Sequence, residues 1–156
     1  MLNPLKPTHA GRFKTYCKEK NMSIKKVVVA GGGVLGSQIA FQAAFKGFDV
    51  TIWLRSDASI GRSQPKIDRL HNIYLAEFKD IKTKLGTTGA AFPRGLIDDP
   101  EHVSAEKIAE LEAKTEAAYK NLKLTTDLAA AAKDADIVIE SMAENPQAKK
   151  EFYDAL

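Results

Sequence analysis

Hydrophobic and polar positions along the chain follow two alternating patterns. Residues 27–30 form a continuous apolar run, Val-Val-Val-Ala, which predicts a strand buried on both faces. After three glycines, residues 34–45 predict a helix, and Lys46 and Gly47 are typical of its C-terminal end. A second apolar run, residues 50–54, predicts the next strand. This alternation of strand and helix is typical of an α/β domain with a parallel sheet.

The middle of the chain has a longer helical pattern. Residues 64–85 place their apolar side chains on one helical stripe, namely Ile67, Leu70, Ile73, Tyr74, Phe78, Ile81 and Leu85. Residues 86–100 are rich in Gly, Thr and Pro and predict a loop. Residues 104–122 predict a second helix, with Ser104 as N-cap and an inward stripe of Ile108, Leu111, Thr115, Ala118 and Leu122. Because two such helices exceed what a minimal crossover needs, we expect a helical hairpin inserted at about residues 62–122.

Shorter patterns then predict the remaining elements. They are a strand over 123–125, a helix over 128–133 capped by Asp127, a strand over 136–140, and a helix that starts at Pro146 after the N-cap Asn145. Neither a fifth strand nor a C-cap signal precedes Leu156. We therefore expect one domain over residues 23–156 that is truncated at its C-terminal end.

Charge is unevenly spread along the chain. The formal net charge is +3, but residues 1–26 hold seven Lys and Arg against one acid, and the remaining residues have a net charge of −3. We interpret residues 1–22 as a basic tail that is disordered or dispensable, with a natural start at Met22 or an organellar presequence as alternatives. Because no basic stripe or aromatic platform accompanies the tail, we expect no nucleic-acid partner.

The single cysteine, Cys17, lies in this tail. One cysteine excludes an internal disulfide and a cysteine metal cluster, and it is consistent with a reducing compartment. No apolar run is long enough to span a membrane. We therefore expect a cytoplasmic protein without a membrane partner.

A glycine motif lies between the first predicted strand and the first predicted helix. Gly31, Gly33 and Gly36 form G-x-G-x-x-G, in which they serve a tight turn, the close approach of a pyrophosphate and helix-to-strand packing, respectively. The first helical turn, with Val34 and Leu35, offers free N–H groups to phosphates. The motif and its context predict a Rossmann-type doubly wound parallel sheet that binds a dinucleotide. A glycine-rich turn without a ligand is the alternative.

The end of the second predicted strand departs from the usual NAD pattern. An acidic residue about 20 positions after the motif normally binds the ribose hydroxyl, but this chain has Leu54. Arg55 and Ser56 offer donors for a 2′-phosphate instead, since guanidinium binds phosphate in a bidentate manner. Arg55 could equally be a solvated cation, and Asp57 could reach a ribose by another route. The cofactor is therefore NAD or NADP, and Leu54 counts against FAD as well.

Two segments together resemble the N-terminal NAD-binding domain of the 3-hydroxyacyl-CoA dehydrogenase family, and most of all the 3-hydroxybutyryl-CoA dehydrogenases. These are VAGGGVLGSQIAFQAAFKGFDVTIW and LTTDLAAAAKDADIVIESMAENPQAKKEFYDAL. The resemblance implies hydride transfer between a 3-hydroxyacyl-CoA and NAD(P), with Ser141, Glu144 and Lys149 in the cofactor site. A solvated surface pair is the alternative for Glu144 and Lys149.

The resemblance also implies what this chain lacks. The catalytic residues of the family lie beyond Leu156, so we expect no catalytic residue here and no activity of the fragment alone. His9, His71 and His102 are poor candidates for the catalytic base. The family's helical C-terminal domain completes the acyl-CoA site, and the full-length form is expected to be a homodimer in fatty acid metabolism.

Two other functions remain open. The first is an NADP-linked dehydrogenase of a small hydroxy acid or a polyol phosphate, which the Trp-Leu-Arg-Ser ending of the second strand suggests. The second is a non-catalytic nucleotide-binding module that works as this short chain.

Overall fold

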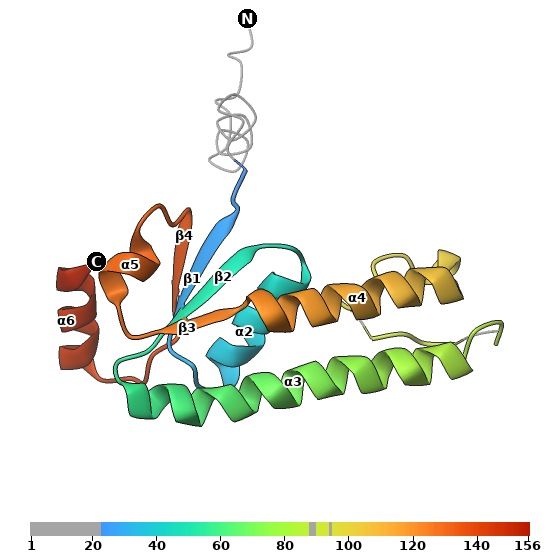
Figure 1. The fold of residues 1–156 in the computed structure, drawn as a ribbon, viewed down its shortest axis with the longest axis horizontal. Helices are drawn as coiled ribbons and strands as arrows, with labels where there is room; N and C mark the ends of the chain where they lie inside the picture. The colour runs from blue at the N-terminus through green and yellow to red at the C-terminus, as the bar shows by residue number, and fades with distance from the viewer. Residues whose placement is uncertain (1–22, 88–89, 94) are drawn as a thin grey trace, which may run out of the picture.

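A four-stranded parallel sheet with helices on both faces forms the centre of the molecule (Figure 1). The computed structural model describes residues 23–87, 90–93 and 95–156. The predicted tail over residues 1–22, including Cys17 and His9, lies outside the described residues. Within them, the predicted α/β architecture, a doubly wound sheet with an inserted helical hairpin, is confirmed.

The strands follow the order β3-β2-β1-β4. Their bounds are β1 Lys26–Ala30, β2 Asp49–Trp53, β3 Lys123–Thr125 and β4 Ile137–Glu140. β1 pairs with β2 and with β4, so Ala30 lies opposite Trp53 on one side and Glu140 on the other. After β3 the chain crosses back to place β4 on the other side of β1. Because all the pairings are parallel, the carboxyl ends of β1, β2 and β4 meet at one edge.

Alternate residues of β1 supply the cores on the two faces of the sheet. Val27 and Val29 pack with α2 (Val34–Phe45), whereas Val28 and Ala30 pack with α5 (Leu128–Ala132) and α6 (Pro146–Ala155). This two-sided burial explains why the strand reads as a continuous apolar run. The predicted N-caps Asp127 and Asn145 both accept hydrogen bonds from backbone N–H groups, at 2.9 and 3.0 Å.

The inserted hairpin consists of α3 (Asp57–Thr83) and α4 (Ala105–Asn121), joined by a loop that holds the short helix η1 (Pro100–His102). The two long helices run side by side away from the sheet (Figure 1). The hairpin has its own core, and Ser104 caps α4 as predicted. Leu96 and Ile97 of the connecting loop are buried in that core, which its Gly- and Pro-rich composition did not indicate.

Two predictions about α3 are wrong. The helix begins at Asp57, directly after β2, and not at Gln64, and Pro65 lies inside it. The apolar stripe does not reveal the first two turns, because their buried residue Ser63 is polar and donates to the Gly32 carbonyl at 3.0 Å. Ile73 was expected on the inward stripe but is exposed, whereas Ile67, Phe78 and Ile81 of the same helix are buried.

A membrane-spanning helix is not found in the described ranges, because none of their helices is both long and apolar enough. The same residues contain no group of three His, Cys, Asp or Glu side chains placed to hold a metal ion.

Candidate dinucleotide site

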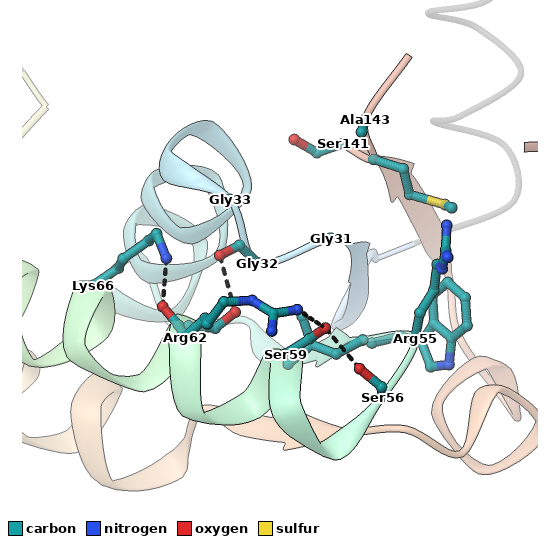
Figure 2. Close-up of a pocket in the computed structure, with 14 residues that line it drawn as sticks. Gly31, Gly32, Gly33, Arg55, Ser56, Ser59, Arg62, Lys66, Ser141 and Ala143 are labelled. Atoms are coloured by element: carbon teal, nitrogen blue, oxygen red, sulfur yellow. Dashed lines mark hydrogen bonds between the residues drawn. The ribbon is translucent and has the colours of Figure 1, made fainter. Parts of the chain in front are cut away.

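A cleft of about 470 Å³ opens at the carboxyl edge of the sheet (Figure 2). Three segments line it: the glycine loop after β1, the corner between β2 and α3, and the segment after β4. The lining residues are 31–33, 53–56 with Ser59, Arg62, Ser63 and Lys66, and 141–143. Open α/β sheets bind their ligands at this position, outside the carboxyl ends of the strands.

Gly31 and Gly36 hold the backbone of the glycine loop in place. Gly31 has a φ of +117°, and a Cβ there would lie 2.4 Å from the carbonyl oxygen of Ser141. A Cβ at Gly36 would lie 2.0 Å from the carbonyl oxygen of Gly31, so α2 approaches the loop as closely as backbone atoms allow. These geometries agree with the turn and packing functions expected of the two glycines.

Gly32 is a structural residue that the motif pattern did not single out. Its carbonyl accepts hydrogen bonds from the hydroxyls of Ser63 and Ser37, at 3.0 and 3.3 Å. A Cβ at Gly32 would lie 2.2 Å from Ser63 Oγ and 2.8 Å from Leu54 Cδ2. The glycine loop is thus hydrogen-bonded to both α2 and α3. The contact with α3 could not be predicted from the sequence without knowing that this helix begins before residue 64.

Gly33 faces open space, in contrast to its neighbours. No atom lies within 4 Å of the position of a Cβ on Gly33 among the described residues. Gly33 is also the N-cap of α2, and no side chain of the described ranges caps the first N–H groups there. Unpaired N–H groups at a helix N-terminus bind phosphate, so the cleft, Gly33 and the start of α2 fit the pyrophosphate of a dinucleotide.

The corner between β2 and α3 carries positive charge and hydroxyl groups. Arg55, Arg62 and Lys66 line the cleft, and Arg62 Nη2 donates to Ser59 Oγ at 2.7 Å. Leu54 also lines the cleft but belongs to the core beneath it, with 4% of its surface exposed. Asp57 is turned away, since its carboxylate accepts from the Thr126 hydroxyl at 3.4 Å. The structure thus offers no support for a ribose contact by Asp57.

The segment after β4 forms the third side of the cleft. Ser141 lines it, and the Ser141 N–H donates to the Ala30 carbonyl at 2.9 Å, which ties this segment to β1. Glu144 and Lys149 lie outside the lining residues and form an ion pair at 2.8 Å. The surface pair left open by the sequence is therefore present, although it does not test a contact with the cofactor.

Lys149 is held by a second carboxylate, which the sequence did not indicate. Its ammonium lies 2.9 Å from Glu140 at the end of β4. The hydrogen bond from Lys149 lowers the pKa of the Glu140 carboxyl, and the Met142 N–H adds to this effect. In turn, Glu144 and then Glu140 raise the pKa of the Lys149 ammonium. Both shifts favour the ionised forms of Glu140 and Lys149.

The structure brings some of the predicted site residues together and separates others. Those that line the cleft are Gly31, Gly33, Leu54, Arg55 and Ser141. Val34, Leu35 and Gly36 lie at the start of α2 just beyond it; Val34 and Leu35 are largely exposed, whereas Gly36 is buried against the loop. Sequence reasoning missed Gly32 and Lys66, and it also missed Ser59, Arg62 and Ser63, which precede residue 64, where α3 was expected to begin.

Comparison with known proteins identifies the family. The model of the 3-hydroxyacyl-CoA dehydrogenase NAD binding domain matches residues 26–156. The chain belongs to this family. As a 3-hydroxyacyl-CoA dehydrogenase NAD-binding domain, it takes NAD or NADP as its cofactor, in agreement with the geometry of the glycine loop.

Solved structures of similar fold support this assignment. A diketoreductase is 31% identical with a TM-score of 0.60, and the match covers 86% of this chain and 38% of that protein. The 3-hydroxybutyryl-CoA dehydrogenase from Escherichia coli is 24% identical with a TM-score of 0.57, covering 85% and 21%. The (S)-3-hydroxybutyryl-CoA dehydrogenase from Ralstonia eutropha is 21% identical with a TM-score of 0.52, covering 84% and 35%. The last two likenesses show the fold alone.

The chain thus spans well under half the length of these structural relatives. A search of the curated proteins finds no match.

Proposed function

We propose that this domain binds a nicotinamide dinucleotide and presents it for hydride transfer between a 3-hydroxyacyl-CoA and the corresponding 3-ketoacyl-CoA. The observation that carries the proposal is the cleft at the carboxyl ends of β1, β2 and β4, with open space at Gly33 beside the uncapped start of α2. When bound, the dinucleotide supplies the hydride acceptor or donor. The residues of the chain bind and orient it.

The base that removes the hydroxyl proton comes, in this proposal, from a part of the protein beyond this chain. Neither described histidine lines the cleft: His71 stacks on Tyr119 at 4.3 Å in the hairpin, and His102 lies 2.9 Å from Asp99 in the connecting loop. We extend the proposal to a homodimer of the longer protein, acting on acyl-CoA in the cytoplasm as part of fatty acid metabolism. The 3-hydroxybutyryl-CoA dehydrogenases among its structural relatives support the substrate class.

A two-part experiment tests the proposal. Titration of the 156-residue chain with NADH and NADPH, followed by the fluorescence of the reduced nicotinamide, should show saturable binding of at least one of them. Assay of the same chain with 3-hydroxybutyryl-CoA and oxidised cofactor should show no turnover. Binding of neither cofactor would overturn the proposal of a dinucleotide site, and robust turnover would place the catalytic base within this chain.

A second candidate keeps the fold and the cofactor but changes the substrate to a small carbonyl compound without CoA, such as a keto acid or a keto sugar phosphate. Two observations favour it: the basic corner after β2 and the 31% identity to a diketoreductase described as acting on dicarbonyl compounds. Parallel assays of the longer protein on acetoacetyl-CoA and on small dicarbonyl compounds would separate the two candidates. Binding of cofactor with no activity toward either would favour the non-catalytic module.

A further inference from the structure

The corner between β2 and α3 lies where a Rossmann-type domain meets the adenine ribose of its cofactor. In NAD-binding domains an acid at the end of the second strand accepts hydrogen bonds from the ribose hydroxyls. Here β2 ends at Trp53, and Leu54 follows, with its N–H donating to the Thr125 carbonyl at 2.8 Å. The Leu54 side chain packs into the core beneath the glycine loop and can accept no hydrogen bond from a ribose.

Positive charge takes the place of that acid. Arg55 follows Leu54 directly, and Arg62 and Lys66 come from successive turns of α3, with Arg62 extending along the helix toward Ser59 (Figure 2). The described residues that line the cleft include three basic side chains and no aspartate or glutamate. Such a lining attracts an anion more strongly than it attracts a neutral ribose hydroxyl.

Hydroxyl groups beside these cations are already arranged in a hydrogen-bonded series. Arg62 Nη2 donates to Ser59 Oγ at 2.7 Å, and Ser59 Oγ lies 3.0 Å from Ser56 Oγ. Lys66 donates to the Arg62 carbonyl on the same face of the helix. A phosphate with three acceptor oxygens matches a guanidinium flanked by hydroxyl donors, whereas a ribose hydroxyl pair does not require them.

We propose that this corner is a binding site for the 2′-phosphate of NADP, formed by Arg55, Ser56, Ser59 and Arg62, and that the domain prefers NADP over NAD. The inference rests on the proposed dinucleotide function and adds its cofactor specificity. Lys66 contributes charge at the side of the cleft nearer the glycine loop. Ser59 and Arg62 come from α3 of the inserted hairpin, and Arg55 and Ser56 come from the turn that joins β2 to it.

Paired titrations test the proposal on the 156-residue chain. NADPH should bind at least about tenfold more tightly than NADH, because only NADPH presents the additional dianion. Competition against bound NADPH should be stronger for 2′-AMP than for 5′-AMP, because only 2′-AMP carries a phosphate at the ribose position that the proposed site binds. Equal binding of the two dinucleotides, or preference for NADH, would overturn the 2′-phosphate site and leave the dinucleotide function standing. Binding of neither would overturn both.

Variants locate the site. Arg62→Ala and Arg55→Ala should each weaken NADPH binding by about tenfold and leave NADH binding unchanged. Arg69→Ala is the matched control, because Arg69 is an exposed arginine of the same helix that does not line the cleft. An equal loss of NADPH and NADH affinity in Arg62→Ala would overturn the assignment. Arg62→Gln, which keeps most of the side chain, gives the same readout should the alanine variant lose its fold.

Discussion

The glycine loop after β1 and the turn between β2 and α3 differ in how closely their residues match the sequence pattern of an NAD-binding domain. After β1, the motif glycines have backbone geometry that agrees with the functions expected of them, and Gly31, Gly32 and Gly36 leave no room for a Cβ. After β2, a buried leucine stands where the ribose-binding acid belongs, and arginine, lysine and serine side chains line the cleft. The comparison suggests that the pyrophosphate subsite is fixed by backbone geometry, whereas the ribose subsite is set by exchangeable side chains.

The largest expected effect comes from filling the space at Gly31. Gly31→Ala would place a Cβ 2.4 Å from the Ser141 carbonyl at a φ of +117°, so the loop and the segment after β4 must move apart. We expect a loss of at least about 2 kcal/mol in the free energy of unfolding, measured by urea denaturation, together with loss of cofactor binding. Gly61→Ala in α3 is the control, because a Cβ there meets no atom of the described chain within 4 Å. It should leave stability unchanged or increase it by up to about 1 kcal/mol. Equal effects of both changes would refute the tight fit.

The second effect separates two adjacent glycines of the same loop. Gly32→Ala would clash with Ser63 and Leu54, and we expect a loss of about 1–3 kcal/mol in stability. Gly33→Ala meets open space at a φ of −69°, which alanine adopts readily, so stability should change by less than about 0.5 kcal/mol. Cofactor binding should nevertheless weaken by about tenfold in Gly33→Ala, because the methyl group occupies the approach of the pyrophosphate. A Gly33→Ala variant with unchanged affinity for both cofactors would show that the pyrophosphate binds elsewhere.

The third effect tests whether the ribose subsite can be exchanged. Leu54→Asp restores the acid at the end of β2, which accepts hydrogen bonds from ribose hydroxyls and repels a 2′-phosphate. We expect the ratio of NADH to NADPH affinity to rise by about tenfold or more, measured by parallel titrations. Because Leu54 is buried, the variant should also lose stability, and Leu54→Asn serves as a control of similar size without the charge. An unchanged ratio in Leu54→Asp would mean that residue 54 does not face the ribose.

Most of the sheet and the glycine loop could be predicted from the sequence because their constraints are local. The strand β1 is a continuous apolar run, and Asp127, Asn145 and Ser104 cap helices by hydrogen bonds within their own first turns. The basic side of the cleft could not be predicted in the same way. Arg62 and Lys66 reach it only because α3 begins at Asp57 and packs through Ser63 against the Gly32 carbonyl, a contact that spans 31 positions in sequence. A polar contact between a helix and a loop produces no periodic pattern of apolar residues, so the sequence does not indicate it.

The smallest effect concerns the third side of the cleft, after β4. Lys149 and the Met142 N–H hold the pKa of the Glu140 carboxyl below its ordinary value of 4.5. A carboxyl whose pKa is lower in the folded state stabilises that state above its unfolded pKa, and this contribution is lost as the pH falls through the folded pKa. We therefore expect the wild-type free energy of unfolding to fall more steeply below about pH 4.5 than that of Glu140→Gln, with a difference under about 1 kcal/mol because the pair is partly exposed. Thermal denaturation of both proteins from pH 3 to pH 6, roughly the window of this titration, would measure it. Parallel pH profiles would show that Glu140 does not hold Lys149, leaving only the exposed Glu144 to orient that ammonium beside the cleft.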